Sequence, residues 1–149
     1  MIIPDVNVLV YAYRREAERH EKYAAWLSGL AAGSEELGLV ESALTGFVRI
    51  VTNPRIMADP APTTAALDFV GSLRKAKSAR KLIGTEATWR QFEEFAKTDR
   101  QVRGNLVPDA WLAAMTLTHG GRLATADRGV ARFEGLDWFD PGPPGGATH

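Results

Sequence analysis

Four acidic residues of this chain, Asp5, Glu41, Asp109 and Asp127, stand at the ends of apolar segments, where one fold can bring them together. Carboxylates that lie close together repel one another, so proteins seldom gather several of them without a cation. Oxygen ligands with no His or Cys beside them suit Mg²⁺ or Mn²⁺ better than zinc. Such an ion orients a water, lowers the pKa of that water and neutralises charge on a phosphoryl group. The set therefore predicts metal-dependent hydrolysis of a phosphodiester, with a metal-activated water as the attacking group.

Each of these acids also has a purely structural explanation when it is taken alone. Asp5 would cap the helix that follows it, and Asp127 would order a turn. Asp109 and Glu41 would stabilise the first turn of a helix through the helix dipole, by about 0.3–1 kcal/mol each. A metal site is predicted only if the fold brings the acids to one place.

The elements that would position these acids alternate between strand and helix. Strands are predicted over residues 1–5, 37–40, 81–84, 123–125 and 136–139, and helices over 8–15, 19–32, 42–53, 63–77, 88–100, 108–119 and 127–133. Ser42, Thr63 or Thr64, and Thr88 are the expected helix starts. The alternation predicts a three-layer α/β/α sandwich with a mostly parallel central sheet. Ligands bind beyond the carboxyl ends of such strands, which is where the four acids are expected.

The chain has 149 residues, which fits one domain. We assign this domain to residues 1–140 and expect the Pro/Gly-rich segment 141–149 to be a disordered tail. The absence of cysteine excludes disulfides, thiolate zinc sites and cysteine nucleophiles. The start of the chain is unlike a signal peptide, and no apolar run approaches the about 20 residues of a membrane span. A cytoplasmic location is expected.

The charges of the chain balance overall but are unevenly distributed. Eighteen basic residues face eighteen acidic ones, whereas residues 70–103 alone carry nine Lys or Arg against four acids. A balanced total is unlike that of a general nucleic-acid binder, which is usually basic. The basic segment is either a solvated helical surface or a surface that steers a phosphate backbone toward the acids.

Three motifs give the chain a resemblance to a known family. Asp5-Val6-Asn7 follows an apolar strand, residues 105–114 place Asp109 at the start of an Ala-rich helix, and residues 123–133 contain Thr125-Ala126-Asp127. In this order and spacing they resemble the PIN-domain ribonucleases of the VapC toxin type, from type II toxin–antitoxin systems. Residues 47–55 are similar to a segment that is common in VapC toxins, and the likeness runs from residue 1 to about 141.

The resemblance implies a PIN-like fold and a Mg²⁺- or Mn²⁺-dependent endoribonuclease that acts as a toxin. Asp5, Asp109 and Asp127 would bind the metal, and Glu41 would be the fourth catalytic acid. It also implies an RNA substrate, a VapB-type antitoxin and a toxin homodimer. The apolar residues of the first two helices would serve either these interfaces or the core of the monomer: Val8, Leu9, Val10, Tyr11, Tyr13, Tyr23 and Trp26.

One position departs from the family pattern. The family usually has a Glu early in the helix after the second strand, and Gly46 stands there, five residues after Glu41. The alternative reading is therefore a catalytically weak PIN-like module that binds RNA or a protein. A second rival is a phosphatase of the haloacid dehalogenase type, but that family requires Asp-x-Asp where this chain has Asp5 and Asn7.

Several other polar and aromatic residues keep two explanations at this point. Asn7 and Thr125 would hold a carboxylate or act only as caps, whereas Arg49, Asn53 and Asn105 would order local structure or contact RNA. The four tryptophans have core-like spacing, although exposed ones would stack on bases. The three histidines are scattered and have no metal-like spacing.

Overall fold

The structure is a computed structural model that describes residues 1–143, so most of the tail predicted over 141–149 lies outside the described residues. The strands are β1 (Ile2–Pro4), β2 (Leu37–Val40), β3 (Ala79–Leu82), β4 (Arg122–Ala124) and β5 (Trp138–Phe139). The helices are α1 (Val6–Tyr13), α2 (His20–Ala32), α3 (Glu41–Val51), α4 (Thr63–Arg74), α5 (Glu86–Thr98) and α6 (Val107–Thr118), with short 3₁₀ helices η1 (Gly104–Leu106) and η2 (Arg128–Arg132). Strand and helix alternate as predicted.

The five strands form one sheet in the order β3-β2-β1-β4-β5, and every strand pair is parallel. β1 lies at the centre, where Ile2 pairs with Leu37 of β2 and Ile3 pairs with Leu123 of β4. The residues of β1 and β2 are all buried, as expected for a parallel sheet covered on both faces, whereas the edge strand β3 exposes two charged residues. The predicted sandwich is confirmed, with a sheet that is wholly parallel within residues 1–143.

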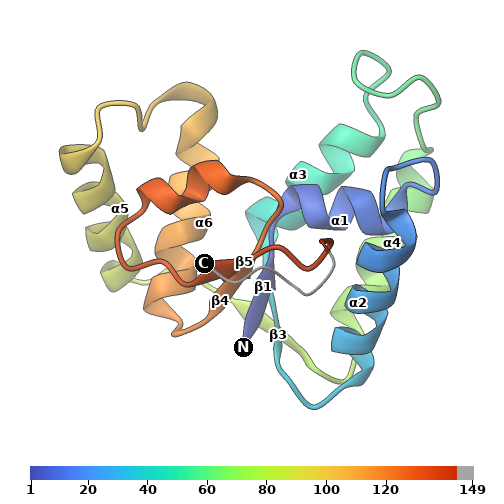
Figure 1. The fold of residues 1–149 in the computed structure, drawn as a ribbon, viewed down its shortest axis with the longest axis horizontal. Helices are drawn as coiled ribbons and strands as arrows, with labels where there is room; N and C mark the ends of the chain where they lie inside the picture. Colours follow the sequence, from blue (N-terminus) through green and yellow to red (C-terminus); the bar gives the residue numbers. More distant parts are fainter. Residues whose placement is uncertain (144–149) are drawn as a thin grey trace.

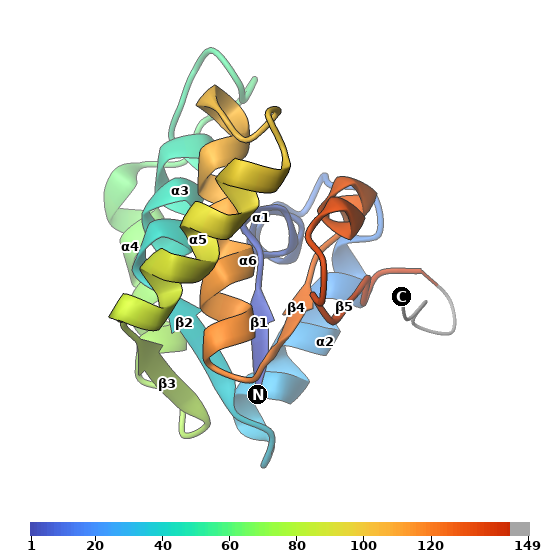
Figure 2. The ribbon, with the colours of Figure 1, turned by 90° about the vertical axis from the view of Figure 1, so that its left-hand side faces the viewer.

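Helices cover the two faces of this sheet in two separate groups. Helices α1, α2 and α4 lie on one side of β1 and helices α5 and α6 on the other (Figures 1 and 2). One buried cluster contains residues of helices α1, α2, α3 and α4 together with strands β1 and β2. A second cluster packs α5, α6 and η2 against the opposite face of the sheet. No helix within residues 1–143 is long and apolar enough to cross a membrane.

The order of the strands creates a crevice beside β1. From β1 the chain steps outward to β2 and β3, then returns through α5 and α6 to place β4 on the other side of β1. The connections leaving the carboxyl ends of β1 and β4 therefore diverge. In open parallel sheets this switch point is where ligands bind. Asp5 directly follows β1, and Asp127 lies three residues after β4.

The apolar residues of the first two helices belong mainly to the core of the monomer. Val8 and Leu9 are fully buried, Val10 and Tyr23 nearly so, and the rings of Tyr13, Phe47 and Phe69 pack together. The interface role that the sequence left open for Val8 and Leu9 is therefore wrong.

The tryptophans differ in exposure. Trp138 is buried, and Trp26 and Trp111 are half-buried, as the core interpretation expects. Trp89, however, is 51% exposed and rests its ring against that of Trp111. The core interpretation is therefore wrong for Trp89. Its helical spacing places it on the correct face of α5, but this part of the face lies beyond the buried core.

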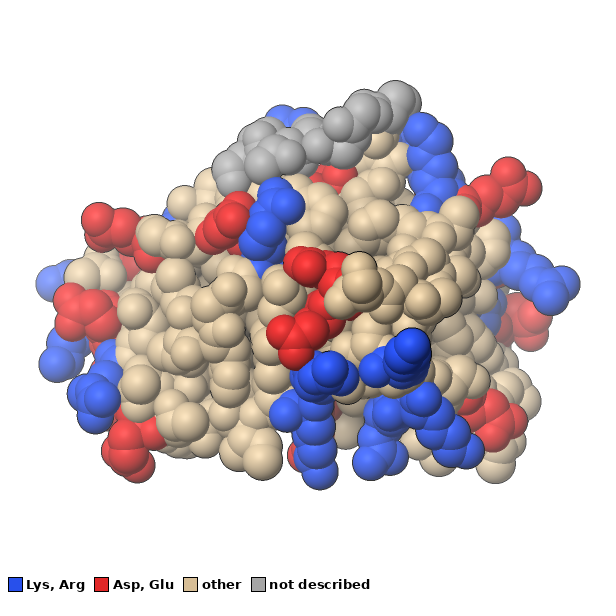
Figure 3. All heavy atoms as spheres, turned by 90° about the horizontal axis from the view of Figure 1, so that it is seen from below, with Lys and Arg blue, Asp and Glu red and all other residues tan. Residues whose placement is uncertain are grey.

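Charged residues of the basic segment 70–103 partly pair with acids. Arg80 contacts Glu36 at 2.9 Å and Lys81 contacts Glu41 at 3.2 Å. Figure 3 views the molecule from the end where β1 begins, and there basic side chains lie beside acidic ones. The solvated-surface explanation of the segment fits these two residues.

The roles of the first residues of three helices differ from the prediction. Ser42 lies inside α3, which begins at Glu41, and Thr63 opens α4 without a side-chain cap hydrogen bond. The third difference is at α5, which Thr85 caps: its hydroxyl accepts from the Thr88 N–H at 3.4 Å, and Thr88 Oγ1 accepts from the Thr85 N–H at 3.1 Å. Thr88 is thus the second partner of a capping box, not the start of the helix.

Removing the Thr85 hydroxyl tests this cap. Thr85→Ala should lower the free energy of unfolding by about 1 kcal/mol, because one backbone donor of the first turn of α5 loses its partner. Thr63→Ala is the matched control and should change the free energy by less than about 0.5 kcal/mol. Urea denaturation followed by circular dichroism measures both, and equal effects of the two substitutions would contradict the capping assignment.

Candidate active site

The Asp5 carboxylate is the most deeply buried acidic group at the crevice, with the residue 5% exposed. One oxygen accepts from the N–H of Val6 at 2.7 Å, which caps α1, and the other accepts from the Thr125 hydroxyl at 2.7 Å. Burial raises the pKa of this carboxyl, and these two hydrogen bonds oppose the rise by favouring the charged form. The strand end and the helix start thus fix the position of Asp5.

Thr125 joins Asp5 to the loop that carries Asp127. Its hydroxyl donates to Asp5 and accepts from the side-chain amide of Asn7 at 3.2 Å and from the N–H of Asp127 at 3.1 Å. One donor and two acceptor positions are all that a hydroxyl has, so Thr125 is fully used. Asn7 in turn accepts from the N–H of Ala126 at 3.1 Å. Thr125 and Asn7 therefore do more than cap: their hydrogen bonds link the end of β1 to the loop after β4.

Asp109 approaches the same place from the first turn of α6. The residue is half-buried, and burial raises its carboxyl pKa to about 6, with further contributions from the negative charges of Asp5 and Asp127. Its carboxylate has no hydrogen bond or ion pair to another group within residues 1–143. The charges of three carboxylates from distant parts of the chain thus act on one another, and no cation within residues 1–143 compensates their repulsion.

Asp127 combines the structural role with this electrostatic one. Its carboxylate accepts from the N–H of Gly129 at 2.8 Å and so caps η2, while the side chain stays exposed. The cap interpretation from the sequence was therefore correct for Asp127, and it coexists with a negative charge that acts on both Asp5 and Asp109.

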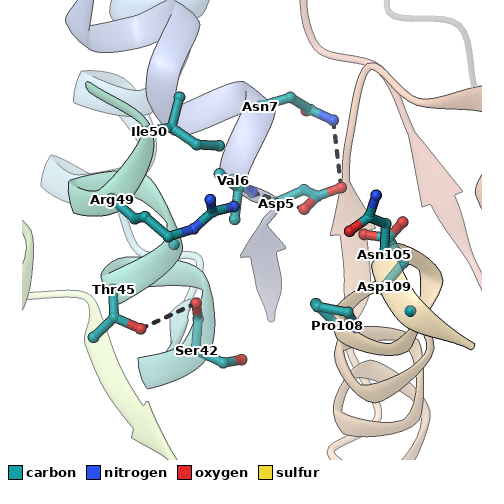
Figure 4. Close-up of a pocket in the computed structure, with 12 residues that line it drawn as sticks. Asp5, Val6, Asn7, Ser42, Thr45, Arg49, Ile50, Asn105, Pro108 and Asp109 are labelled. Carbon is teal, nitrogen blue, oxygen red and sulfur yellow. Dashed lines mark hydrogen bonds between the residues drawn. The ribbon is translucent and has the colours of Figure 1, made fainter. Parts of the chain in front are cut away.

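A cleft of about 610 Å³ opens beside Asp5 and Asp109. Figure 4 shows Asp109 and Asn105 on one side of it and the Arg49 side chain reaching in from α3 on the other. The lining residues are Asp5, Val6, Asn7, Ser42, Thr45, Gly46, Arg49, Ile50, Gly104, Asn105, Pro108 and Asp109.

The sequence contained an unused signal for the α3 wall of this cleft. Polar or small residues recur at helical spacing along α3 (Ser42, Thr45, Gly46 and Arg49), between the buried residues that face the core. Such a stripe predicts a second exposed face. Of these residues, only Gly46 and Arg49 are candidates for the site from the sequence alone. The 3₁₀ turn η1, which carries Asn105 to the cleft, had no recognised sequence signal.

Glu41 does not lie in this cleft. Its exposed carboxylate pairs with Lys81 at 3.2 Å and lines a separate hollow with Arg74. The reason is helical geometry: Glu41 and Gly46 are five residues apart on α3, so the directions in which these two positions face differ by about 140°. Gly46 does line the cleft, as the family pattern requires of that position. The structure thus gives no support to the fourth-acid role predicted for Glu41.

The donor atoms of the site fit a divalent metal ion in chemistry. The three Asp side chains offer only oxygen. Burial, and after it the charges of Asp5 and Asp127, raise the pKa of Asp109, and a nearby cation would stabilise its charged form. Within residues 1–143, however, no three His, Cys, Asp or Glu side chains are already grouped closely enough to enclose an ion. The charges of the three carboxylates therefore affect one another, but hydrogen bonds hold Asp5 and Asp127 in place and not Asp109.

The comparison with known proteins agrees with this arrangement. A family model described as the PIN domain matches residues 2–136, and a VapC ribonuclease of Mycobacterium bovis, Mb2897, is 41% identical over 141 residues, covering 95% of each chain. The chain belongs to the VapC ribonucleases of the PIN-domain family. Another VapC relative, ribonuclease VapC37 of Mycobacterium tuberculosis, is 34% identical over 143 residues, with 95% of this chain and 97% of the relative covered.

Solved structures share the fold of this VapC-family chain at lower identity. VapBC2 from Rickettsia felis, bound to a DNA fragment from its promoter, has a TM-score of 0.69 at 15% identity and covers 93% of this chain and 97% of that one. The sarcin-ricin loop cleaving toxin VapC20 of Mycobacterium tuberculosis has a TM-score of 0.65 at 15% identity and covers 88% and 93%. At these identities the likeness concerns the fold alone.

The raised pKa of Asp109 makes a prediction about the metal-free protein. Folding raises this pKa from 3.8 to about 6, so the folded chain holds the proton more tightly than the unfolded chain. Stability should therefore fall as pH rises from about 4 to about 6 and stay lower above that range. Asp109→Asn removes this loss and should stabilise the protein by about 1 kcal/mol at neutral pH, since solvent screens a half-exposed group.

Thermal unfolding in EDTA at an acidic and a neutral pH measures this effect. Asp68→Asn, at an exposed position on α4, is the matched control and should shift the melting temperature equally little at both pH values. A melting temperature for Asp109→Asn that equals the wild-type value at neutral pH would contradict the electrostatic coupling of the three carboxylates.

Proposed function

We propose that this chain is an endoribonuclease toxin of the VapC type, in which Asp5, Asp109 and Asp127 hold Mg²⁺ or Mn²⁺. The observation that carries the proposal is the convergence of three carboxylates at the switch point of the sheet, without a compensating protein cation. Relatives that match almost the whole chain are named as ribonucleases, which supports RNA as the substrate. A cytoplasmic site of action is part of the proposal.

Each residue of the site has a distinct task in this proposal. Asp5 is a rigid ligand because Thr125 and the N–H of Val6 fix both of its oxygens. Asp109 becomes fully charged only above its raised pKa of about 6, so it ties metal affinity to pH. When bound, the ion would orient water for attack and neutralise charge on the phosphoryl group. No side chain is required as a covalent nucleophile.

The partners follow from the family and from what its solved members contain. Structures that share this fold include a VapBC complex from Haemophilus influenzae and FitAcB from Neisseria gonorrhoeae. We propose a VapB-type antitoxin that inserts a basic group among the carboxylates, where a guanidinium would relieve their repulsion. A toxin homodimer is part of the same proposal. Since Val8 and Leu9 are buried in the core, its interface must use other residues.

One observation favours the alternative of a weak nuclease or binding module. Gly46 lines the cleft at the position where the family usually has Glu, so the α3 wall brings no acid to the site. Three Asp side chains are enough to hold one Mg²⁺ with waters in its other positions, whereas a second ion needs more negative charge. A single ion and a slow rate are the expected consequences.

Conservative changes at the carboxylates test the nuclease itself. Asp5→Asn or Asp127→Asn should abolish Mn²⁺-dependent cleavage of single-stranded RNA, because each keeps the size of the side chain and loses a ligand charge. Asp68→Asn is the control and should cut at the wild-type rate. EDTA should stop wild-type cleavage, and added Mn²⁺ should restore it. Full activity of either site variant would remove that residue from the proposed ligand set.

A pair of variants decides where the fourth acid belongs. Gly46→Glu should raise the cleavage rate and tighten Mn²⁺ binding, because the new carboxylate would enter the cleft. A Cβ at Gly46 meets only the Val6 side chain, at 3.2 Å, which has to shift slightly. Glu41→Gln should leave the rate within about twofold, since its carboxylate is exposed and paired with Lys81. A tenfold loss in Glu41→Gln would instead support Glu41 as a ligand.

A further inference from the structure

Arg49 has an unusual position for a basic residue, because it lies on the wall of an acidic cleft. It belongs to the last turn of α3, and Figure 4 shows its guanidinium reaching toward Val6 and Asp5 from the side opposite Asp109. Among the described residues that line the cleft, it is the only Lys or Arg. Gly46 precedes it by three residues on the same face of the helix and has no side chain to obstruct it.

The guanidinium of Arg49 is not used by the protein itself. It forms no hydrogen bond or ion pair with another group within residues 1–143. Some other arginines are paired, for example Arg122 with Asp137 at 3.1 Å and Arg132 with Asp99 at 2.8 Å. The charge of Arg49 in the last turn of α3 interacts favourably with the helix dipole, but this leaves the N–H donors of the guanidinium unoccupied. Arg49 is therefore available to a ligand that enters the cleft.

The guanidinium does not pair with the carboxylates of the cleft. No hydrogen bond or ion pair joins Arg49 to Asp5 or Asp109 within residues 1–143. The cleft thus keeps opposite charges on its two walls. A ligand that satisfies both carries negative charge toward Arg49 and reaches the carboxylates through a cation. A phosphodiester with a divalent ion has this property, and a planar guanidinium binds phosphate through two parallel N–H donors.

We propose that Arg49 is a phosphate-binding residue, which holds the RNA backbone in the cleft against the metal-binding carboxylates. The inference rests on the proposed ribonuclease function and names the group that binds its substrate. It also gives a reason why Gly46 and Arg49 occur one helical turn apart on α3. Where the family usually presents an acid, this chain has glycine, and one helical turn later it presents a cation, so the α3 wall favours substrate anions over a second metal ion.

RNA binding measured without cleavage is the direct test. The Asp5→Asn variant serves as the non-cleaving background, and fluorescence anisotropy follows a short fluorescein-labelled single-stranded RNA of mixed sequence in Mg²⁺ over a range of salt concentrations. Arg49→Gln, in this background, should weaken binding by about tenfold, as expected for loss of a charged hydrogen-bond donor. The slope of log K against log salt should fall by about 0.7, the value for one phosphate contact with a single strand.

Matched variants separate phosphate binding from loss of charge or loss of structure. Lys22→Gln removes the same charge from an exposed position on α2 and should leave both affinity and slope unchanged. Arg49→Lys should keep the salt slope but lose part of the affinity, because an ammonium lacks the two-pronged geometry. In the otherwise wild-type chain, Arg49→Gln should bind Mn²⁺ at least as tightly as before, since a nearby cation has been removed.

The possible results are distinguishable. If Arg49→Gln binds RNA with the affinity and slope of the Lys22 control, while wild-type protein still cuts RNA, Arg49 is not a phosphate ligand and the ribonuclease proposal stands. If Arg49→Gln also loses Mn²⁺ affinity and melting temperature, its role is structural and the inference fails. If wild-type protein neither binds nor cuts RNA, the proposed function fails, and the inference fails with it.

Discussion

The buried carboxylate of Asp5 is the interaction on which the rest of the site depends. A charged group this deep in a protein is costly unless hydrogen bonds replace the water that it has lost. Val6, Thr125 and Asn7 supply these bonds, and in doing so they join the end of β1 to the start of α1 and to the loop after β4. The same bonds that stabilise the charge therefore also set the geometry of the switch point.

The remaining acids share the environment of Asp5 without being fixed to the same degree. Asp109 is held only by its place on α6, and Asp127 mainly by capping η2. Asp5 is thus fixed, whereas Asp109 and the less firmly held Asp127 are free to adjust their positions when a cation binds. Burial and the charges of Asp5 and Asp127 raise the pKa of Asp109, and a bound divalent ion, or a basic group of an antitoxin, would stabilise the charged carboxylate.

Charge on α3 distinguishes this chain from the pattern its family usually shows. With Gly46 and Arg49 on the cleft side and Glu41 paired with Lys81 elsewhere, the α3 wall is cationic and the opposite wall is acidic. The exposed charges of β3 do not extend this cleft, since Arg80 and Lys81 are occupied by Glu36 and Glu41. If the proposed roles hold, substrate affinity and metal affinity lie on two different walls, and mutation would separate them.

The sequence by itself determined the sandwich fold and placed Asp5, Asp109 and Asp127 at the carboxyl edge of the sheet. Strand and helix periodicity are local properties, and the acids directly follow or begin predicted elements, so their edge was fixed before any packing was known. Tertiary structure decided what depends on rotation about a helix and on distance across the sheet. The side of α3 that faces the cleft excludes Glu41 and admits Arg49, because the packing of α3 fixes the rotation of the helix about its axis and so decides which of its residues face the cleft. The hydrogen bond from Thr125 to Asp5 joins residues 120 positions apart, and only the pairing of β1 with β4 brings them into contact.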